Sequence, residues 1–571
     1  MPPVAADPGL ARGTSRSARR GPAREIAQGA RPSAEDHRVP TSEDERGSPP
    51  GVHSLCPFDG AARRASLLPV PTRPPGPSVS APSLLRELRA TLRLAGPVVA
   101  AQLAFISMSF VDTVMVGRLG PDALAGVALG HTVFFFFAIV GMGTIQAVGP
   151  MVSQAVGARD PTVVARSTRQ GLWLSLSLSV PTVLLLSGLE PLLRWTGQSE
   201  VAVDGAMAYL RAVRWGIVPF LGFAALRSFV EGLARPLPVT LIALVGVGVN
   251  VGANEVLMFG HFGLPALGLA GTGWASTIVY TCLFGALALL VHRVPPFAEH
   301  AVFARLRTPD PEYLSELVRI GAPMGASRGI ESSLFTITTV LMGTLSTAAL
   351  AAHQVALQCA AFTFMVPLGI GMAGSVRVGQ AAGRGDETGV RRAGYVAMGL
   401  AVAFMGLAAI LFLTAPRPIV GLYLDLSAPE NREVVVLATQ LLGIAAVFQV
   451  VDGLQVAAHG ALQGLKDTRV PMGIALVTYW GIGLSTGFLW GVRGGGGPQG
   501  LWWGLVLGLA AASVLLVWRF HRQGRRVSRE ASPESDGPPP ATNGAPADAS
   551  PGASVPSAPR SSPGPAPDAS G

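Results

Sequence analysis

The stretch GPVVAAQLAFISMSFVDTVMVGRLG, residues 96–120, returns in altered form as APMGASRGIESSLFTITTVLMGTLS, residues 322–346. The proline residues near the two starts, Pro97 and Pro323, are 226 positions apart, and the glycines that close the apolar parts keep the same offset. Self-similarity at a fixed spacing indicates a duplicated structural unit. Each half of the chain is therefore predicted to fold in the same way.

Two further matches extend the duplication beyond this stretch. The segment SQAVGARD at 153–160 aligns with GQAAGRGD at 379–386, again 226 positions apart. Later in each half the offset becomes 232, so that Gly232 matches Gly464. Matches in register over roughly 170 residues are hard to attribute to chance.

Charged residues are scarce in the middle of the chain. Residues 81–523 contain 21 acidic and 28 basic residues, so about 11% of these 443 positions are charged, against roughly 25% in a soluble domain. The charges form short clusters between apolar stretches of about 20 residues, the length that crosses a bilayer. This pattern argues against a soluble enzyme and against a nucleic-acid-binding protein, despite a net charge of +9.

Apolar stretches of membrane-spanning length occur twelve times, six in each copy of the repeat. An even number of spans per copy gives both copies the same orientation. We therefore predict an all-α integral membrane protein with twelve transmembrane helices in two parallel six-helix lobes, related by pseudo-two-fold symmetry as in many transporters. The approximate limits of the spans are 94–117, 123–150, 170–189, 206–229, 237–259, 266–291, 316–343, 347–376, 394–414, 435–461, 470–491 and 500–519.

The predicted lobes are residues 90–300, with spans one to six, and residues 301–523, with spans seven to twelve. Residues 1–80 and 524–571 are rich in Pro, Ser, Ala and Gly and have no hydrophobic periodicity. Such composition predicts a disordered N-terminal extension and a disordered C-terminal tail. The extension does not resemble a signal peptide, because no apolar core follows its start.

Basic residues in the loops predict how the protein is oriented. If the N-terminus is cytoplasmic, the inside loops carry thirteen basic residues and the outside loops carry five. Because basic loops stay in the cytoplasm, both termini are predicted to be cytoplasmic. The expected location of this multi-pass protein is the bacterial inner membrane, with membrane lipids as its surroundings.

The sequence offers no sign of a metal, a disulfide framework or a cofactor. Cys56, Cys282 and Cys359 are far apart, and neither CxxC nor Cys/His ligand spacing occurs. A GxxxxGK[ST] phosphate loop is also missing, so an ATP-driven pump would need a separate subunit.

Three acidic residues lie deep inside predicted spans, namely Asp112 in the first, Glu331 in the seventh and Asp452 in the tenth, whereas Glu255 lies near the outer end of the fifth. An aspartate at a helix centre costs roughly 2.5–3.5 kcal/mol on insertion scales, so each acid needs a reason. One explanation is a buried carboxyl group that is hydrogen-bonded to Ser or Thr neighbours. The other is a carboxylate in a water-lined cavity that binds a cation or a proton.

The repeat favours the second explanation. Asp112 aligns with Thr338, and Glu331 aligns with Phe105. The acids are thus specific to one lobe, and the shared fold does not require them twice. Burial raises the pKa of carboxyl groups in general, which allows them to exchange protons near neutral pH.

Two asparagines form another candidate pair. Asn250 and Asn254 are spaced i, i+4 on the fifth span, so their amides share one helix face. They are expected either to form hydrogen bonds between helices or to line a cavity in the first lobe.

Several motifs together resemble the MATE (multidrug and toxic compound extrusion) family, in particular its NorM-like branch, from the first span to the last. The resemblance implies a secondary antiporter, not an enzyme, that expels organic and often cationic compounds in exchange for Na+ or H+. It also implies that Asp112, Glu331 and Asp452 are the functional carboxylates and that Asn250 and Asn254 line the N-lobe cavity. The matching stretches are FVDTVMVGRLG, PMVSQAVGARD, LRSFVEGLARP, NVGAN, ALAAHQVAL, VRVGQAAGRGD and VDGLQVAAHGALQGLKD.

Two positions depart from the family pattern. Phe448 stands one turn before Asp452, where the branch often has Tyr, so the π-face remains and the hydroxyl is missing. Arg328 stands one turn before Glu331, in place of an apolar residue, and can pair with it at i, i+3. We expect Phe448 and Gln449 to line the substrate cavity and Arg328 to modulate Glu331. The coupling ion stays open between H+ and Na+, and both departures favour H+.

Two other functions compete with that of a multidrug efflux antiporter. A lipid-linked oligosaccharide flippase or polysaccharide exporter of the same superfamily is opposed by twelve rather than fourteen spans, and by acids where a pyrophosphate cargo would favour Arg. A membrane-embedded enzyme lacks a metal-ligand cluster, a nucleophile–base pair and a cofactor motif. The predicted partners are small organic cations and lipids, without nucleic acid, and the expected oligomeric state is a monomer.

Overall fold

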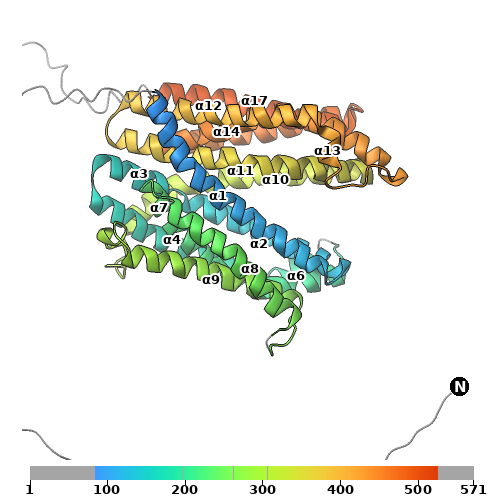
Figure 1. Cartoon of the computed structure of the whole chain (residues 1–571), viewed down its shortest axis with the longest axis horizontal. Coiled ribbons are helices and arrows are strands. Elements are labelled where there is room, and N and C mark those ends of the chain that lie inside the picture. The colour runs from blue at the N-terminus through green and yellow to red at the C-terminus, as the bar shows by residue number, and fades with distance from the viewer. Residues whose placement is uncertain (1–83, 196, 262, 305, 525–571) are drawn as a thin grey trace, which may run out of the picture. The chain divides into compact units, whose positions relative to one another are not determined.

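The structure is a computed structural model that describes residues 84–195, 197–261, 263–304 and 306–524. Every regular element in these residues is helical, and the long helices run side by side as a bundle (Figure 1). The predicted extension 1–80, Cys56 and the predicted tail beyond Gly524 lie outside the described residues. The all-α membrane fold is confirmed.

The helices of the first half are α1 (Leu84–Gly117), α2 (Pro121–Ile145), α3 (Val148–Ala158), α4 (Pro161–Ser187), α5 (Glu190–Trp195), α6 (Glu200–Val213), η1 (Arg214–Gly216), α7 (Ile217–Gly232), α8 (Leu237–Phe259), α9 (Leu269–Arg293) and η2 (Ala298–His300). Two of them, α2 and α4, begin at proline, whose missing N–H is harmless in a first turn.

The second half repeats this order as far as the eleventh predicted span of the chain, which is largely π-helical. Its helices are α10 (Pro311–Leu345), α11 (Thr347–Gly383), α12 (Glu387–Thr414), α13 (Pro416–Val420), η3 (Pro429–Asn431), α14 (Arg432–Gly464), α15 (Arg469–Ala475), the π-helical η4 (Leu476–Leu484), α16 (Ser485–Gly487), the π-helical η5 (Phe488–Arg493) and α17 (Gly497–Gly524).

Eleven helical segments in the described residues are long and apolar enough to cross a membrane. They coincide with eleven of the twelve predicted spans, with α2 and α3 forming one and α6 to α7 another. The remaining span coincides with α10, which has 35 residues. Arg328 and Glu331 lower the mean hydropathy of α10, which is why it is not among the eleven.

Buried apolar residues form one large cluster between positions 108 and 324 and another between 334 and 512. A third cluster joins Leu94, near the start of α1, to α11, α12, α14 and α17. Conversely, Leu317 near the start of α10 belongs to the first cluster. The first helix of each half therefore packs partly against the other half, which ties the two halves together.

Close helix approaches follow the spacing of the repeat. A Cβ atom on Gly143 of α2 would lie 2.9 Å from the Cα atom of Gly325 on α10. A Cβ atom on Gly369 of α11 would lie 3.1 Å from the Cα atom of Val99 on α1. The two pairs are related by the offset of 226, so each copy uses glycine at the same place to let the crossing helix approach.

Candidate functional site

Asp112 lies on α1 and faces α8. The Nδ2 atoms of Asn250 and Asn254 both donate hydrogen bonds to its Oδ1 atom, at 2.9 and 2.6 Å. The two asparagines are 2% and 0% exposed, whereas Asp112 is half-buried. The i, i+4 spacing on α8 aims both amides at one carboxylate, as their shared helix face predicted.

This arrangement leaves oxygen atoms without partners. The Oδ1 atoms of Asn250 and Asn254 are buried and lack a hydrogen bond in the described part of the chain. Unpaired buried acceptors are costly and call for an explanation. Because an amide can turn over and present its oxygen instead of its nitrogen, the cluster can hold either an ionised carboxylate alone or a carboxylate beside a small cation.

The second half has a different polar site, at a small pocket between α10, α14, α15 and η4. Arg328 and Glu331 form an ion pair here, with Nη1 and Oε2 3.0 Å apart. Their side chains are 15% and 17% exposed, so the predicted i, i+3 pairing occurs inside the bundle. The lining residues are Ser327, Arg328, Glu331, Gln455, Val456, His459, Ala475 and Tyr479.

Asp452 lies on α14, one turn before Gln455, and is 4% exposed. Glu331 and Arg328 lie close enough to act on its charge. No hydrogen bond found in the described residues reaches this carboxyl group, and the nearby Oε1 atom of Gln455 is also buried without a partner. Two carboxyl groups and one guanidinium group therefore lie near one another in this region, and the guanidinium pairs with Glu331.

Phe448 and Gln449 are buried in the packed interior of the second half. Phe448 is 2% exposed and makes edge-to-face contacts with Phe335 and Trp502, at ring-centroid distances of 6.2 and 5.6 Å. The Oε1 atom of Gln449 accepts a hydrogen bond from the Thr363 hydroxyl, while its Nε2 atom is buried without a partner. Their expected role in lining the substrate cavity stays a prediction.

A third polar cluster, which the sequence analysis did not single out, lies around Arg227 on α7. Its Nε atom lies 2.7 Å from Glu231, one Nη atom donates to Gln102 at 2.6 Å, and the guanidinium lies 5.2 Å from the ring centroid of Phe105. The charged side chains are 10% and 7% exposed. This ion pair is buried and is not a surface pair at a helix end.

The repeat register could have revealed this cluster. With the offsets of 226 and 232, Gln102 corresponds to Arg328, and Arg227 corresponds to His459. The cluster in the first half and the pocket in the second half are thus equivalent places. The arginine has moved from one helix to another, which the alignment of single residues did not suggest.

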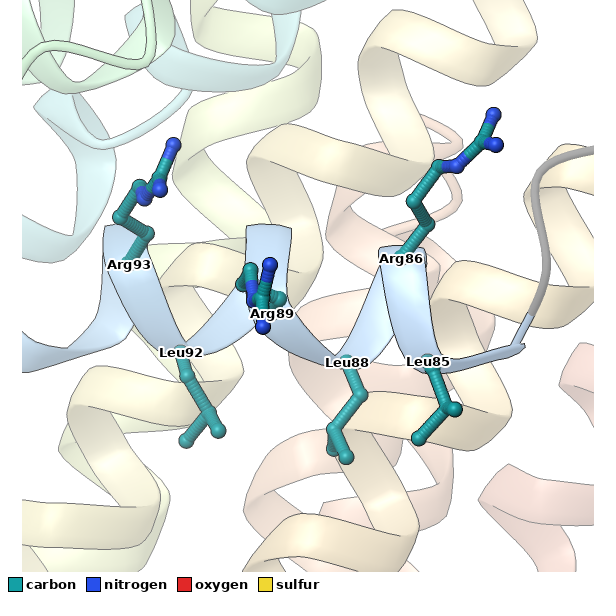
Figure 2. Close-up of a pocket in the computed structure, with 6 residues that line it drawn as sticks. All are labelled: Leu85, Arg86, Leu88, Arg89, Leu92 and Arg93. Atoms are coloured by element: carbon teal, nitrogen blue, oxygen red, sulfur yellow. The ribbon is translucent and has the colours of Figure 1, made fainter.

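Two other features bear on possible ligand sites. No group of three His, Cys, Asp or Glu residues that could hold a metal occurs in the described residues. A hollow at the start of α1 is lined by three arginines and three leucines, and the leucines point to the side of the helix opposite Arg86 and Arg93 (Figure 2). Its last residue, Arg93, is 19 positions before Asp112, roughly 28 Å along the helix, so the hollow is separate from the carboxylates.

Comparison with known proteins identifies the family. The MatE family profile matches residues 97–256 and 323–489, one segment in each copy of the repeat. The chain belongs to the MatE family. MatE proteins are membrane transporters and not enzymes, and this agrees with the predicted function class.

Relatives named NorM match the MatE region of this chain closely. The "Probable multidrug resistance protein NorM" of Pseudomonas aeruginosa is 41% identical over 454 residues, which cover 80% of this chain and 93% of the relative. The "Multidrug resistance protein NorM" of Burkholderia vietnamiensis is 43% identical over 441 residues, covering 77% and 95%. The predicted NorM-like branch is therefore confirmed.

Solved structures share the fold. The eukaryotic MATE transporter AtDTX14 superposes with a TM-score of 0.70 at 21% identity, covering 79% of this chain and all of that one. A multidrug resistance MATE transporter solved in an outward-facing conformation gives a TM-score of 0.69 at 19% identity, covering 78% of this chain and 98% of that one.

Proposed function

We propose that this protein is a multidrug efflux antiporter of the inner membrane, which expels organic cations in exchange for an ion. Its NorM relatives carry multidrug resistance in their names, and MatE transporters use ion gradients without a cofactor. The flippase alternative is not favoured, because relatives that cover 80% and 77% of this chain are named multidrug resistance proteins. The protein acts in lipid on small substrates.

One observation carries the proposal: Asp112 accepts hydrogen bonds from two buried amides whose own oxygen atoms have no hydrogen-bond partner among the described residues. A carboxylate so placed can carry a negative charge, a proton or a small cation with little change in the surrounding helices. Exchange of these occupants changes the net charge of the cavity. A cationic drug and the ion then compete for one charge, which is the minimum requirement for antiport.

The second polar site supports protons as the coupling ion. Arg328 already supplies a positive charge to Glu331 at 3.0 Å, so a sodium ion in that pocket would meet like charge. Ions then exchange at Asp112, and the polar site around Arg328 and Glu331, with Asp452 nearby, tunes the cycle. We assign Asp112 as the coupling carboxylate and Asn250 and Asn254 as the residues that bind it. We assign Glu331 and Asp452 as the functional carboxylates of the second lobe.

The same proposal includes the arrangement in the membrane. The N-lobe is residues 90–300, the C-lobe is residues 301–523, and both chain ends face the cytoplasm, on the basis of the basic loops. We expect a monomer to transport, because the carboxylates lie within one chain.

Efflux of ethidium from a pump-deficient host tests the function. Cells that express this protein should retain less ethidium than cells with an empty vector, and collapse of the proton gradient should remove the difference. Equal retention with comparable expression would oppose the proposal.

A further inference from the structure

Two glutamines reach across the boundary between the halves at one end of the bundle. Gln154 on α3 donates its Nε2 hydrogen bond to the carbonyl oxygen of Gly464 on α14, at 2.8 Å. Gln380 on α11 donates to the carbonyl oxygen of Gly232 on α7, at 3.4 Å. Both the donors and the acceptors are equivalent in the repeat, with offsets of 226 and 232, so the contact is reciprocal.

The two accepting carbonyls need partners because each belongs to the last residue of its helix. The final carbonyls of a helix have no N–H further along the helix to bind. After each glycine the chain turns through a left-handed residue, Ala234 with φ 58° and Lys466 with φ 59°. The N–H groups of Ala234 and Lys466 donate to the carbonyl oxygens of Glu231 and Gln463. The carbonyl oxygens of the two glycines can therefore accept hydrogen bonds from the glutamines of the other half.

The backbones of α3 and α11 also approach each other so closely that only glycine fits at the contact. A Cβ atom on Gly157 would overlap the carbonyl oxygen of Gln380, and one on Gly383 would overlap the carbonyl oxygen of Gln154. These contacts are again equivalent under the offset of 226. Glu87, at the start of α1, binds Arg377 one turn before Gln380, which locates the contact at the end of the bundle where α1 begins (Figure 1).

We propose that Gln154 and Gln380 form a reciprocal latch, which closes this end of the transporter and must release once in every transport cycle. The inference rests on the antiport function and the cytoplasmic orientation proposed above. When the halves part, water can replace the glutamine at each carbonyl, so release is reversible. Because the two hydrogen bonds are equivalent across the boundary, separation of the halves breaks both of them.

Distance measurements by electron paramagnetic resonance on the full chain in nanodiscs test the latch. Spin labels at Ala158→Cys and Arg384→Cys, in a background without Cys56, Cys282 and Cys359, report the separation of α3 and α11. Labels on the protein with both glutamines should give a dominant short distance. The double variant Gln154→Met, Gln380→Met should raise the ratio of separated to closed molecules about fivefold or more, from the net worth of a hydrogen bond.

A matched control removes an amide hydrogen bond elsewhere. Gln440 accepts from Gln499 at 2.6 Å within the second half, so Gln440→Met should leave the distance distribution unchanged. Gly157→Ala gives a second, independent route to separation. Its control is Gly399→Ala, because a Cβ atom on Gly399 meets nothing within 4 Å.

The outcomes separate the latch from the transport proposal. A shift in the glutamine double variant and in Gly157→Ala, but in neither control, supports the latch whether or not ethidium is transported. Distributions identical to those of the controls overturn the latch, even if drug efflux is intact.

Discussion

Asp112 stands apart from the other two membrane carboxylates in its partners. Within the part of the chain that the structure describes, it accepts two amide hydrogen bonds and forms no ion pair, whereas Glu331 binds Arg328. Its charge is therefore balanced only by dipoles, so a proton or a cation changes the site most. This difference singles out Asp112 as the residue whose loss should uncouple transport.

Asp112→Asn should lower ethidium efflux about tenfold or more, because the isosteric amide keeps the shape and cannot exchange a proton. Expression and detergent stability should stay near those of the parent. Asp204→Asn is the control, since Asp204 is 68% exposed and pairs with Arg194 at the surface. Efflux equal in the two variants would contradict the assignment.

Arg328→Met should make transport sensitive to sodium. Without the guanidinium group, Glu331 becomes a buried carboxylate that lacks a partner, and such a charge attracts a proton or a cation. Sodium should then change the efflux rate about twofold or more at fixed pH. The double variant Arg328→Met, Glu331→Gln removes both charges and should lose this response. A parent protein with the same sodium response would refute the role given to Arg328.

The sequence anticipated these residues unevenly, for physical reasons. The Arg328–Glu331 pair and the shared face of Asn250 and Asn254 depend on helical spacing alone, and local sequence shows spacing. The bond from Asp112 to the asparagines joins positions 138 and 142 apart, so only packing reveals it. The Arg227 cluster was not singled out from the sequence, because the repeat exchanges its arginine for His459.

At the scale of elements, α1 and α10 each cross from one half to the other. The crossing of α1 is fixed by Glu87, whose carboxylate binds Arg377 on α11 through two hydrogen bonds of 2.9 and 2.8 Å. Length and apolar content located eleven of the spans in the described residues, whereas α10 falls short on apolar content because it carries Arg328 and Glu331. Hydropathy could not show the crossing, nor the breaks at η1 and between α2 and α3, because packing decides them.

Glu87→Gln should destabilise the folded protein by about 2 kcal/mol, since a bidentate charged hydrogen-bonded pair is lost from a side chain that is 5% exposed. Thermal unfolding in detergent measures the effect. Asp310→Asn is the comparison, because the pair of Asp310 with Arg166 is 28% and 44% exposed. It should lower the melting temperature less. A larger loss at Asp310 would show that α1 is not fixed by this pair.

Asp310 also predicts a modest dependence on pH. The Arg166 guanidinium beside Asp310 holds the pKa of that carboxyl below its usual value of 3.8. The stabilisation is therefore present above the ordinary pKa and is lost as pH falls through the lowered one. Parent and Asp310→Asn should differ in melting temperature at pH 7 and converge in strong acid. A constant difference across this range would contradict the ion-pair explanation.

At the scale of the whole molecule, the two halves have the same order of membrane spans and the same direction. With both ends in the cytoplasm, reporter fusions after Arg235 and Arg307 should read inside, and fusions after Gln198 and Arg493 should read outside. The loops with most basic residues stay in the cytoplasm. One robust reversal would overturn the predicted topology.

The account rests on ion exchange at Asp112, and transport in proteoliposomes with imposed gradients tests it most directly. The purified parent protein should move ethidium against its gradient when a proton gradient is imposed in sodium-free buffer. A sodium gradient at equal pH on both sides should drive little movement, and Asp112→Asn should respond to neither. Transport that requires sodium, or coupled transport that survives Asp112→Asn, would contradict the account.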